Sequence, residues 1–95
     1  MNYLEKIGFT SEDINEIQRT TTDVIFNLLK EQKKVVGANI NYLKNIGITN
    51  YREIFVKYPD LFLIDNSNFM EIFEKYDRED LISKLSHNLD IFVFL

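Results

Sequence analysis

Hydrophobic side chains recur at every third or fourth position across residues 25–46. The positions are Ile25, Leu29, Gln32, Val36, Ile40, Leu43 and Ile46, with Gln32 the one polar member. These steps follow the turn of about 3.6 residues in an α-helix, whereas a half-buried strand alternates every second residue. The stripe therefore predicts a helical fold. Gly37 lies inside it, which leaves two alternatives: one long helix, or two helices with a bend near Gly37.

Glycine and threonine predict the ends of several helices. We expect Gly8 to end a short first helix in a left-handed cap. Thr10 or Ser11 is then expected to cap the next helix, because a side-chain oxygen there accepts from a free backbone N–H. The run Thr20–Thr22 is expected to interrupt that helix, since β-branched hydroxyl residues favour caps and turns. Thr49 is expected to cap a later helix in the same way.

The second half of the chain also favours short helices. Pro59 is expected to end the helix that follows Thr49, because the residue before a proline is pushed out of the helical region. Leu61–Ile64 is apolar enough for a strand, but a lone strand has no partner, so we expect a tight turn. Asp77 can cap a final helix. The pattern predicts one all-α domain over residues 1–95, with five or six short helices.

Two stretches of the chain repeat each other. Tyr3–Thr10 and Tyr42–Thr49 match at an offset of thirty-nine residues and share Tyr-Leu, Ile-Gly and Thr. A shorter element, Asp followed by three apolar residues, recurs at 23–26, 60–63 and 90–93. This recurrence predicts helix–turn–helix repeats that bury their apolar faces by stacking on one another.

The repeat resembles a known family. The matching residues are Leu43-x-x-Ile46-Gly47-Ile48-Thr49, a short helix with Ile54, and Tyr58-Pro59-Asp60-Leu61-Phe62. They are similar to the repeat of the mitochondrial transcription termination factor (mTERF) family, over about residues 4–63. The resemblance implies stacked helix–turn–helix repeats. Members of that family bind double-stranded nucleic acid along a basic concave face. Thr20–Thr22 stand where the first repeat would have its proline, and the chain is far shorter than a typical member.

The composition excludes several classes of protein. The chain has 95 residues and no cysteine, which removes disulfides, thiolate catalysis and zinc–thiolate sites. Ile91–Leu95 is its longest apolar run, so we expect no membrane span. We expect a cytoplasmic protein, or one from another reducing intracellular compartment.

Neither an enzyme nor a metal or cofactor site is expected. The sequence holds no calcium loop, no phosphate-binding loop, no Gly-x-Gly-x-x-Gly and no His-Glu-x-x-His. The one histidine, His87, could be catalytic with Ser83, which lies four residues before it. A histidine near a helix C-terminus more often interacts favourably with the negative end of the helix dipole, so we favour that role.

Charge is divided unevenly along the chain. Residues 1–58 carry eight Lys and Arg against seven acids, whereas residues 59–95 carry three against eight, a net charge of −5. The basic residues between positions 30 and 57 are Lys30, Lys33, Lys34, Lys44, Arg52 and Lys57. They are candidates for phosphate contacts and support nucleic-acid binding as the alternative function. A solvated helix face is the other interpretation.

The apolar C-terminal run suggests a second surface. Phe92, Phe94 and Leu95 are candidate partner-binding residues, because chain ends are usually polar unless they dock. They could instead fold back and cover the repeat stack, which we favour, or form a partner or homodimer surface. The leading functional hypothesis is a small non-enzymatic binding module, a protein–protein adaptor or inhibitor. Its protein partner is not identified by the sequence.

Overall fold

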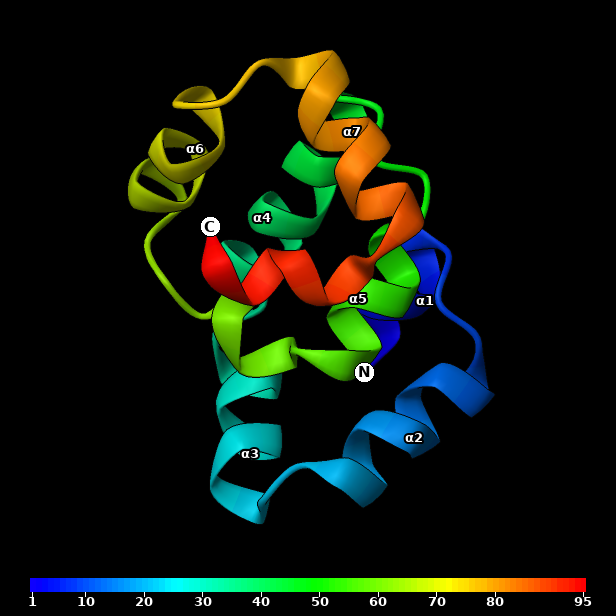
Figure 1. Ribbon diagram of the computed structural model, residues 1–95. Coiled ribbons are helices and arrows are strands. Elements are labelled where there is room, and N and C mark those ends of the chain that lie inside the picture. The colour runs from blue at the N-terminus through cyan, green and yellow to red at the C-terminus, as the bar shows by residue number, and fades with distance from the viewer.

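Helices make up every regular element of this protein. The computed structural model describes residues 1–95 and contains seven α-helices and two short 3-10 helices, with no strand (Figure 1). The α-helices are α1 (Asn2–Ile7), α2 (Ser11–Thr20), α3 (Asp23–Glu31), α4 (Lys33–Asn45), α5 (Tyr51–Lys57), α6 (Asn66–Glu74) and α7 (Arg78–His87). The 3-10 helices are η1 (Pro59–Phe62) and η2 (Leu89–Phe94). The all-α prediction is confirmed, with a few more helices than the expected five or six. No helix has both the length and the apolar character needed to cross a lipid bilayer.

The long apolar stripe is divided at a different place from the one expected. Gln32, with φ −92° and ψ 36°, separates α3 from α4, and Gly37 lies within α4. Both predicted alternatives, an unbroken helix and a bend near Gly37, were therefore wrong. A Cβ at Gly37 would lie 4.0 Å from Cδ1 of Ile7. This is an ordinary contact distance, so the packing of α1 on α4 does not require glycine at position 37. The two helices separate at the solvent-exposed Gln32.

Most of the expected caps are present. Thr10 accepts from the backbone N–H of Asp13, whose carboxylate accepts from Thr10 in return, and Asp77 caps α7. Thr22 starts α3 directly after the break in the threonine run. The expectation for Thr49 was wrong: Asn50 is the N-cap residue of α5, and its side-chain amide does not cap the helix but donates to the carbonyl of Leu85 at 3.0 Å.

The two echoing stretches end their helices with the same turn. The N–H of Phe9 donates to the carbonyl of Leu4 at 3.0 Å, and the N–H of Ile48 donates to that of Leu43 at 3.1 Å. The glycine before each donor has a positive φ, 123° at the first copy and 99° at the second. Only glycine adopts this backbone conformation without strain, so the shared Ile-Gly pair has a local physical cause.

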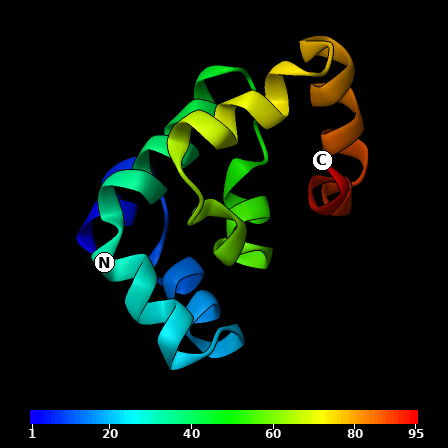
Figure 2. The same cartoon turned by 90° about the vertical axis from the view of Figure 1, so that its left-hand side faces the viewer.

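Helix α4 lies at the centre of the fold. It packs against α1, α3, α5, α6 and η1. Figures 1 and 2 place α2 and α3 at one end of the molecule and α6 and α7 at the other, with the C-terminal segment between α6 and α5 in the view of Figure 1. Pro59 ends α5, and the residues after it form η1, so the expected tight turn is confirmed. This turn brings Phe62 into the core beside Phe92 from η2.

Candidate partner-binding surface

The apolar C-terminal segment divides between the core and the surface. In η2, Phe92 is 6% exposed, whereas Val93 is 49% and Phe94 83% exposed. A 3-10 helix turns once in about three residues, so residues two positions apart point in different directions. The segment therefore covers the core with one side chain and presents others to solvent.

Phe92 is part of a cluster of aromatic rings. Its ring stacks on that of Phe62, with centroids 5.4 Å apart and planes 16° apart. The ring centroids of Phe69 and Phe73 from α6 lie 6.3 and 5.7 Å from that of Phe92. These contacts fasten η2 to α6 and η1, although the three elements are distant in sequence.

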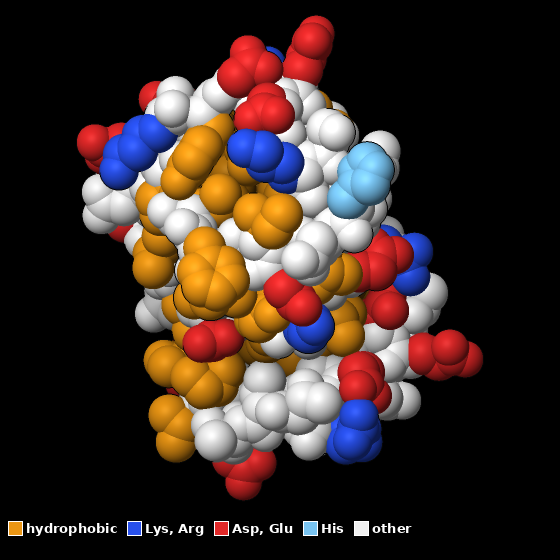
Figure 3. Space-filling view, viewed as in Figure 1, with side chains coloured by type: hydrophobic (Ala, Val, Ile, Leu, Met, Phe, Trp, Pro, Cys, Tyr) orange, Lys and Arg blue, Asp and Glu red, His pale blue; other side chains and the backbone are white.

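A groove lined only by hydrophobic residues lies over this cluster. Its volume is about 230 Å³, and its lining consists of Leu61, Ile64, Phe69, Ile72, Phe73, Phe92, Val93 and Leu95. On the face that bears the C-terminal segment, hydrophobic side chains gather over and beside it (Figure 3). Phe92 and Leu95, two of the predicted partner-binding residues, line the groove, and the third, Phe94, projects next to it. The other six lining residues were not predicted. One of them, Val93, belongs to the same C-terminal run, and the sequence shows the other five only as a turn and as the apolar stripe of a helix.

A buried asparagine holds the η1 side of the groove. Asn39 of α4 is completely buried, and its amide donates to the carbonyls of Phe62 and Ile64, each at 2.9 Å. Asn66 at the start of α6 donates to the Asn39 side-chain oxygen. Sequence reasoning assigned no role to Asn39. The sequence does contain a sign of it: Asn39 is a polar residue that lies three positions after Val36 and four before Leu43, on the same helix face as these apolar residues.

A partly buried aspartate holds the η2 side. Asp90 accepts from Nζ of Lys57 and from the hydroxyl of Tyr58, each at 2.6 Å. The hydrogen bonds from these two residues lower the pKa of Asp90 below its usual value. Lys57, predicted to contact phosphate, is thus paired within the chain.

Carboxylates follow or precede several lining residues of the groove in the sequence. Asp60, Asp65, Glu71 and Glu74 each neighbour a lining residue, and no Lys or Arg does so. None of the four takes part in an ion pair within the chain. The Asp65 carboxylate accepts from two backbone N–H groups at the start of α6, and Glu74 borders a separate hollow with Arg78. Asp60 and Glu71 therefore contribute free negative charge next to lining residues of the groove.

The six predicted phosphate-contacting residues do not form one free surface. Lys44 donates to the carbonyl of Ile7 at 3.4 Å, and its ammonium lies 5.8 Å from the centre of the Tyr51 ring. Lys30, Lys33 and Lys34 are exposed and have no ion-pair partner. Lys30 and Lys33, together with Lys6, border an open hollow of about 460 Å³ beside the first residues of α1.

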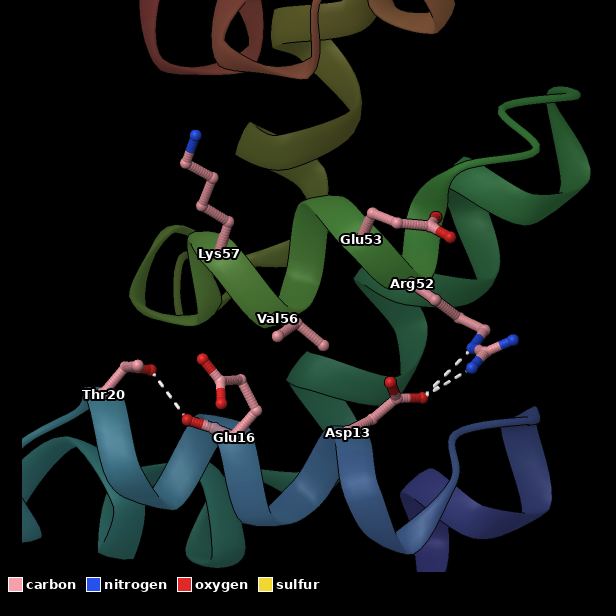
Figure 4. A pocket seen from close by; sticks show the side chains of 7 residues that line it. All are labelled: Asp13, Glu16, Thr20, Arg52, Glu53, Val56 and Lys57. Atoms are coloured by element: carbon pink, nitrogen blue, oxygen red, sulfur yellow. Dashed lines mark hydrogen bonds and ion pairs between the residues drawn. The ribbon is translucent and has the colours of Figure 1, made fainter.

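Arg52 is held in a second, polar groove between α2 and α5. Its guanidinium points toward Asp13, and both Nε and Nη2 donate to the same carboxylate oxygen, at 3.1 and 2.8 Å (Figure 4). Burial alone would raise the pKa of Asp13, but the backbone N–H of Thr10 and the Arg52 guanidinium outweigh it and lower that pKa. Glu16, in the same groove, pairs with Arg19. The ion pair between Arg52 and Asp13 therefore joins α5 to α2, and the pair between Arg19 and Glu16 lies within α2.

His87 contacts the backbone of its own helix. Its Nδ1 lies 2.8 Å from the carbonyl oxygen of Ser83, to which the hydroxyl of Ser86 also donates. The contact is to the main chain of Ser83 and not to its hydroxyl. No three His, Asp or Glu side chains gather where they could hold a metal ion.

Comparisons of the chain with protein-family models, with curated proteins and with solved structures found no match. The resemblance to mTERF repeats stays a prediction.

Proposed function

We propose that this protein is a small non-enzymatic binding module, an adaptor or inhibitor, that receives a segment of a partner protein in the groove between η1, α6 and η2. One observation carries the proposal: eight hydrophobic side chains line an open groove, and one of them, Val93, and its neighbour Phe94 are exposed. Exposed apolar surface of this kind commonly marks an interaction site.

The dimensions of the groove favour a protein segment over a small molecule. Its volume of about 230 Å³ is below the ~300–1,000 Å³ typical of small-molecule sites. Its lining lacks the convergent polar groups that orient such ligands. One or two anchoring side chains of a partner fit this description better.

A photo-crosslinking experiment tests the proposal. A photoreactive phenylalanine analogue placed at position 94 should form cross-links to a partner in extracts of the source organism. The same analogue at position 24 is the control, because Val24 is also exposed, at 69%, but lies on α3 far along the chain. Cross-links specific to position 94 that disappear in Val93→Ser would support the proposal. Equal capture from both positions would refute it.

The arrangement of helices supports a finer proposal about the fold. The nine helices divide in order into three groups of three, α1–α2–α3, α4–α5–η1 and α6–α7–η2. The turns after α1 and α4 share the same hydrogen bonds, and η1 and η2 each begin one residue before an aspartate of the recurring element. We propose three stacked repeats, as the mTERF resemblance would imply.

Nucleic-acid binding is the second candidate. The lysines without ion-pair partners at positions 30, 33 and 34 favour it, because unpaired cations are available to phosphates. A mobility-shift titration with double-stranded DNA and RNA tests it, with Lys30→Gln, Lys33→Gln and Lys34→Gln combined in one variant. Binding weaker than about 10⁻⁴ M at moderate salt would eliminate this candidate.

A further inference from the structure

We infer that the segment received by the groove is an amphipathic helix with Lys and Arg on its polar face. This inference rests on the proposed function and adds the chemistry of the partner. It follows from the charges around the groove, from the secondary structure that forms it and from the arrangement of charge over the whole chain.

The carboxylates around the groove favour a cationic partner. Asp60 and Glu71 are exposed and have neither an ion-pair partner nor a side-chain hydrogen bond in the chain, so both are available to a cation from outside. Residues 59–95 as a whole carry three basic and eight acidic side chains. The two cations beside α6 do not line the groove: Lys75 follows the helix directly, and Arg78 borders a separate hollow. An opposite charge on the partner would steer its approach and select it against acidic competitors.

The secondary structure around the groove favours a helix. The fold has no strand, so it offers no sheet edge to which an extended peptide could add. An apolar floor of Phe69, Phe73 and Phe92, with Leu61 on one side, is the arrangement that receives hydrophobic anchors at helical spacing. The volume of the groove accommodates one or two of these anchors.

The same charges disfavour two other occupants. A symmetric dimer through this groove would bring two copies of the segment 59–95, each with net charge −5, against one another. An anionic lipid surface would be repelled for the same reason. A basic helix satisfies both the apolar groove and its charged surroundings.

Two synthetic helical peptides test the inference. Both carry the same leucine stripe at positions i, i+3, i+4 and i+7 over about five turns, and they differ in having Lys or Glu on the polar face. Binding to the full chain is followed by fluorescence anisotropy at low and moderate salt. We expect the Lys peptide to bind more tightly than the Glu peptide by about tenfold or more, and to weaken as salt rises.

Matched variants locate the binding. The combination Asp60→Asn, Glu71→Gln should weaken the Lys peptide by about threefold to tenfold. Its control, Glu5→Gln, Glu12→Gln, removes the same charge from exposed residues of the other half and should leave the affinity unchanged. Phe94→Ser should weaken binding of the peptide, and the circular dichroism of each variant verifies that it is folded.

The outcomes separate this inference from the proposed function. If the Glu peptide binds as tightly as the Lys peptide and Phe94→Ser weakens both, the groove is a docking site and the basic partner is wrong. Loss of affinity that is equal in the two charge variants would also overturn the inference. If neither peptide binds, while phosphatidylcholine vesicles or a second copy of the chain bind in a manner sensitive to Phe94→Ser, both proposals fail.

Discussion

The side-chain amide of Asn66 donates a hydrogen bond to the side-chain oxygen of Asn39 over 2.9 Å. The side-chain amide of Asn39 in turn donates to the carbonyls of Phe62 and Ile64. One buried amide from α4 thus fixes the end of η1, the turn that follows it and the start of α6. The position of the groove depends on this arrangement.

Replacing Asn39 should destabilise the fold. Asn39→Leu keeps a similar volume but leaves two backbone carbonyls and the Asn66 amide without their partner. We expect the free energy of unfolding to fall by about 2–3 kcal/mol, the scale of an unsatisfied buried polar group. Urea denaturation measures it. Asn41→Ala, on the exposed face of the same helix, is the control and should change stability by less than about 0.5 kcal/mol.

The three glycines should respond differently to alanine. Gly8→Ala and Gly47→Ala place a side chain at positive φ, so each should lower stability by about 1–2 kcal/mol. Gly37→Ala should raise it by about 0.4–1 kcal/mol, because Gly37 is helical and the new Cβ meets Ile7 only at 4.0 Å. Thermal denaturation of the three variants tests this. A loss of stability in Gly37→Ala would contradict the close but ordinary packing of α1 on α4.

Two phenylalanines of η2 should differ in their effect on stability. Phe92→Ala removes a ring from the aromatic cluster and should cost about 3–5 kcal/mol, a large part of the stability of a small domain. Phe94→Ala should change stability by no more than about 0.5 kcal/mol, because that ring is exposed. Chemical denaturation distinguishes them. Similar losses in the two variants would mean that both rings belong to the core.

Stability should fall in acid partly through Asp13 and Asp90. Both carboxyls have a pKa below their ordinary value of 3.8 in the folded protein. Their stabilising contribution is therefore present above pH 3.8 and is lost as the pH falls through the lower folded pKa values. We expect Asp13→Asn and Asp90→Asn to be less stable than the parent chain at neutral pH and closer to it in acid. Parallel pH profiles of unfolding would contradict these assignments.

Tyr3 should ionise later than an ordinary tyrosine. Burial raises its pKa to about 12, and its hydroxyl donates to the carbonyl of Leu29 at 2.6 Å. The associated stability is complete below pH 10 and is lost as the pH rises toward 12. Ultraviolet titration of the parent chain and of Tyr3→Phe should show that the substitution removes the last phenolate to form. If Tyr3→Phe instead removes a phenolate that forms near the ordinary tyrosine pKa, the assignment to Tyr3 is refuted.

Features that depend on near neighbours in the chain were predictable. Helical spacing, the Thr10 and Asp77 caps, the end of α5 before Pro59 and the positive φ of Gly8 each follow from interactions within a few residues. The prediction was wrong where more than one residue was able to end a helix. The helices separate at the exposed Gln32, whereas Gly37 continues inside α4 next to Ile7 of α1.

The candidate surface was predictable only in part. The sequence marked the C-terminal run as unusual, and Phe92 and Leu95 do line the groove. Apart from Val93 of η2, its other lining residues come from η1, the turn after it and α6. Their arrangement around one groove depends on contacts such as Asn39 with Phe62, which join residues 23 positions apart.

The amino-acid order by itself therefore determined an all-helical chain, the positions of most helix ends and the separation of charge between its two halves. The tertiary structure alone decided which of the C-terminal phenylalanines is buried and which cations remain free. Lys57 and Arg52 are neutralised by Asp90 and Asp13, 33 and 39 residues away along the chain. Burial and ion pairing depend on distances in space, and these are set only when the helices pack.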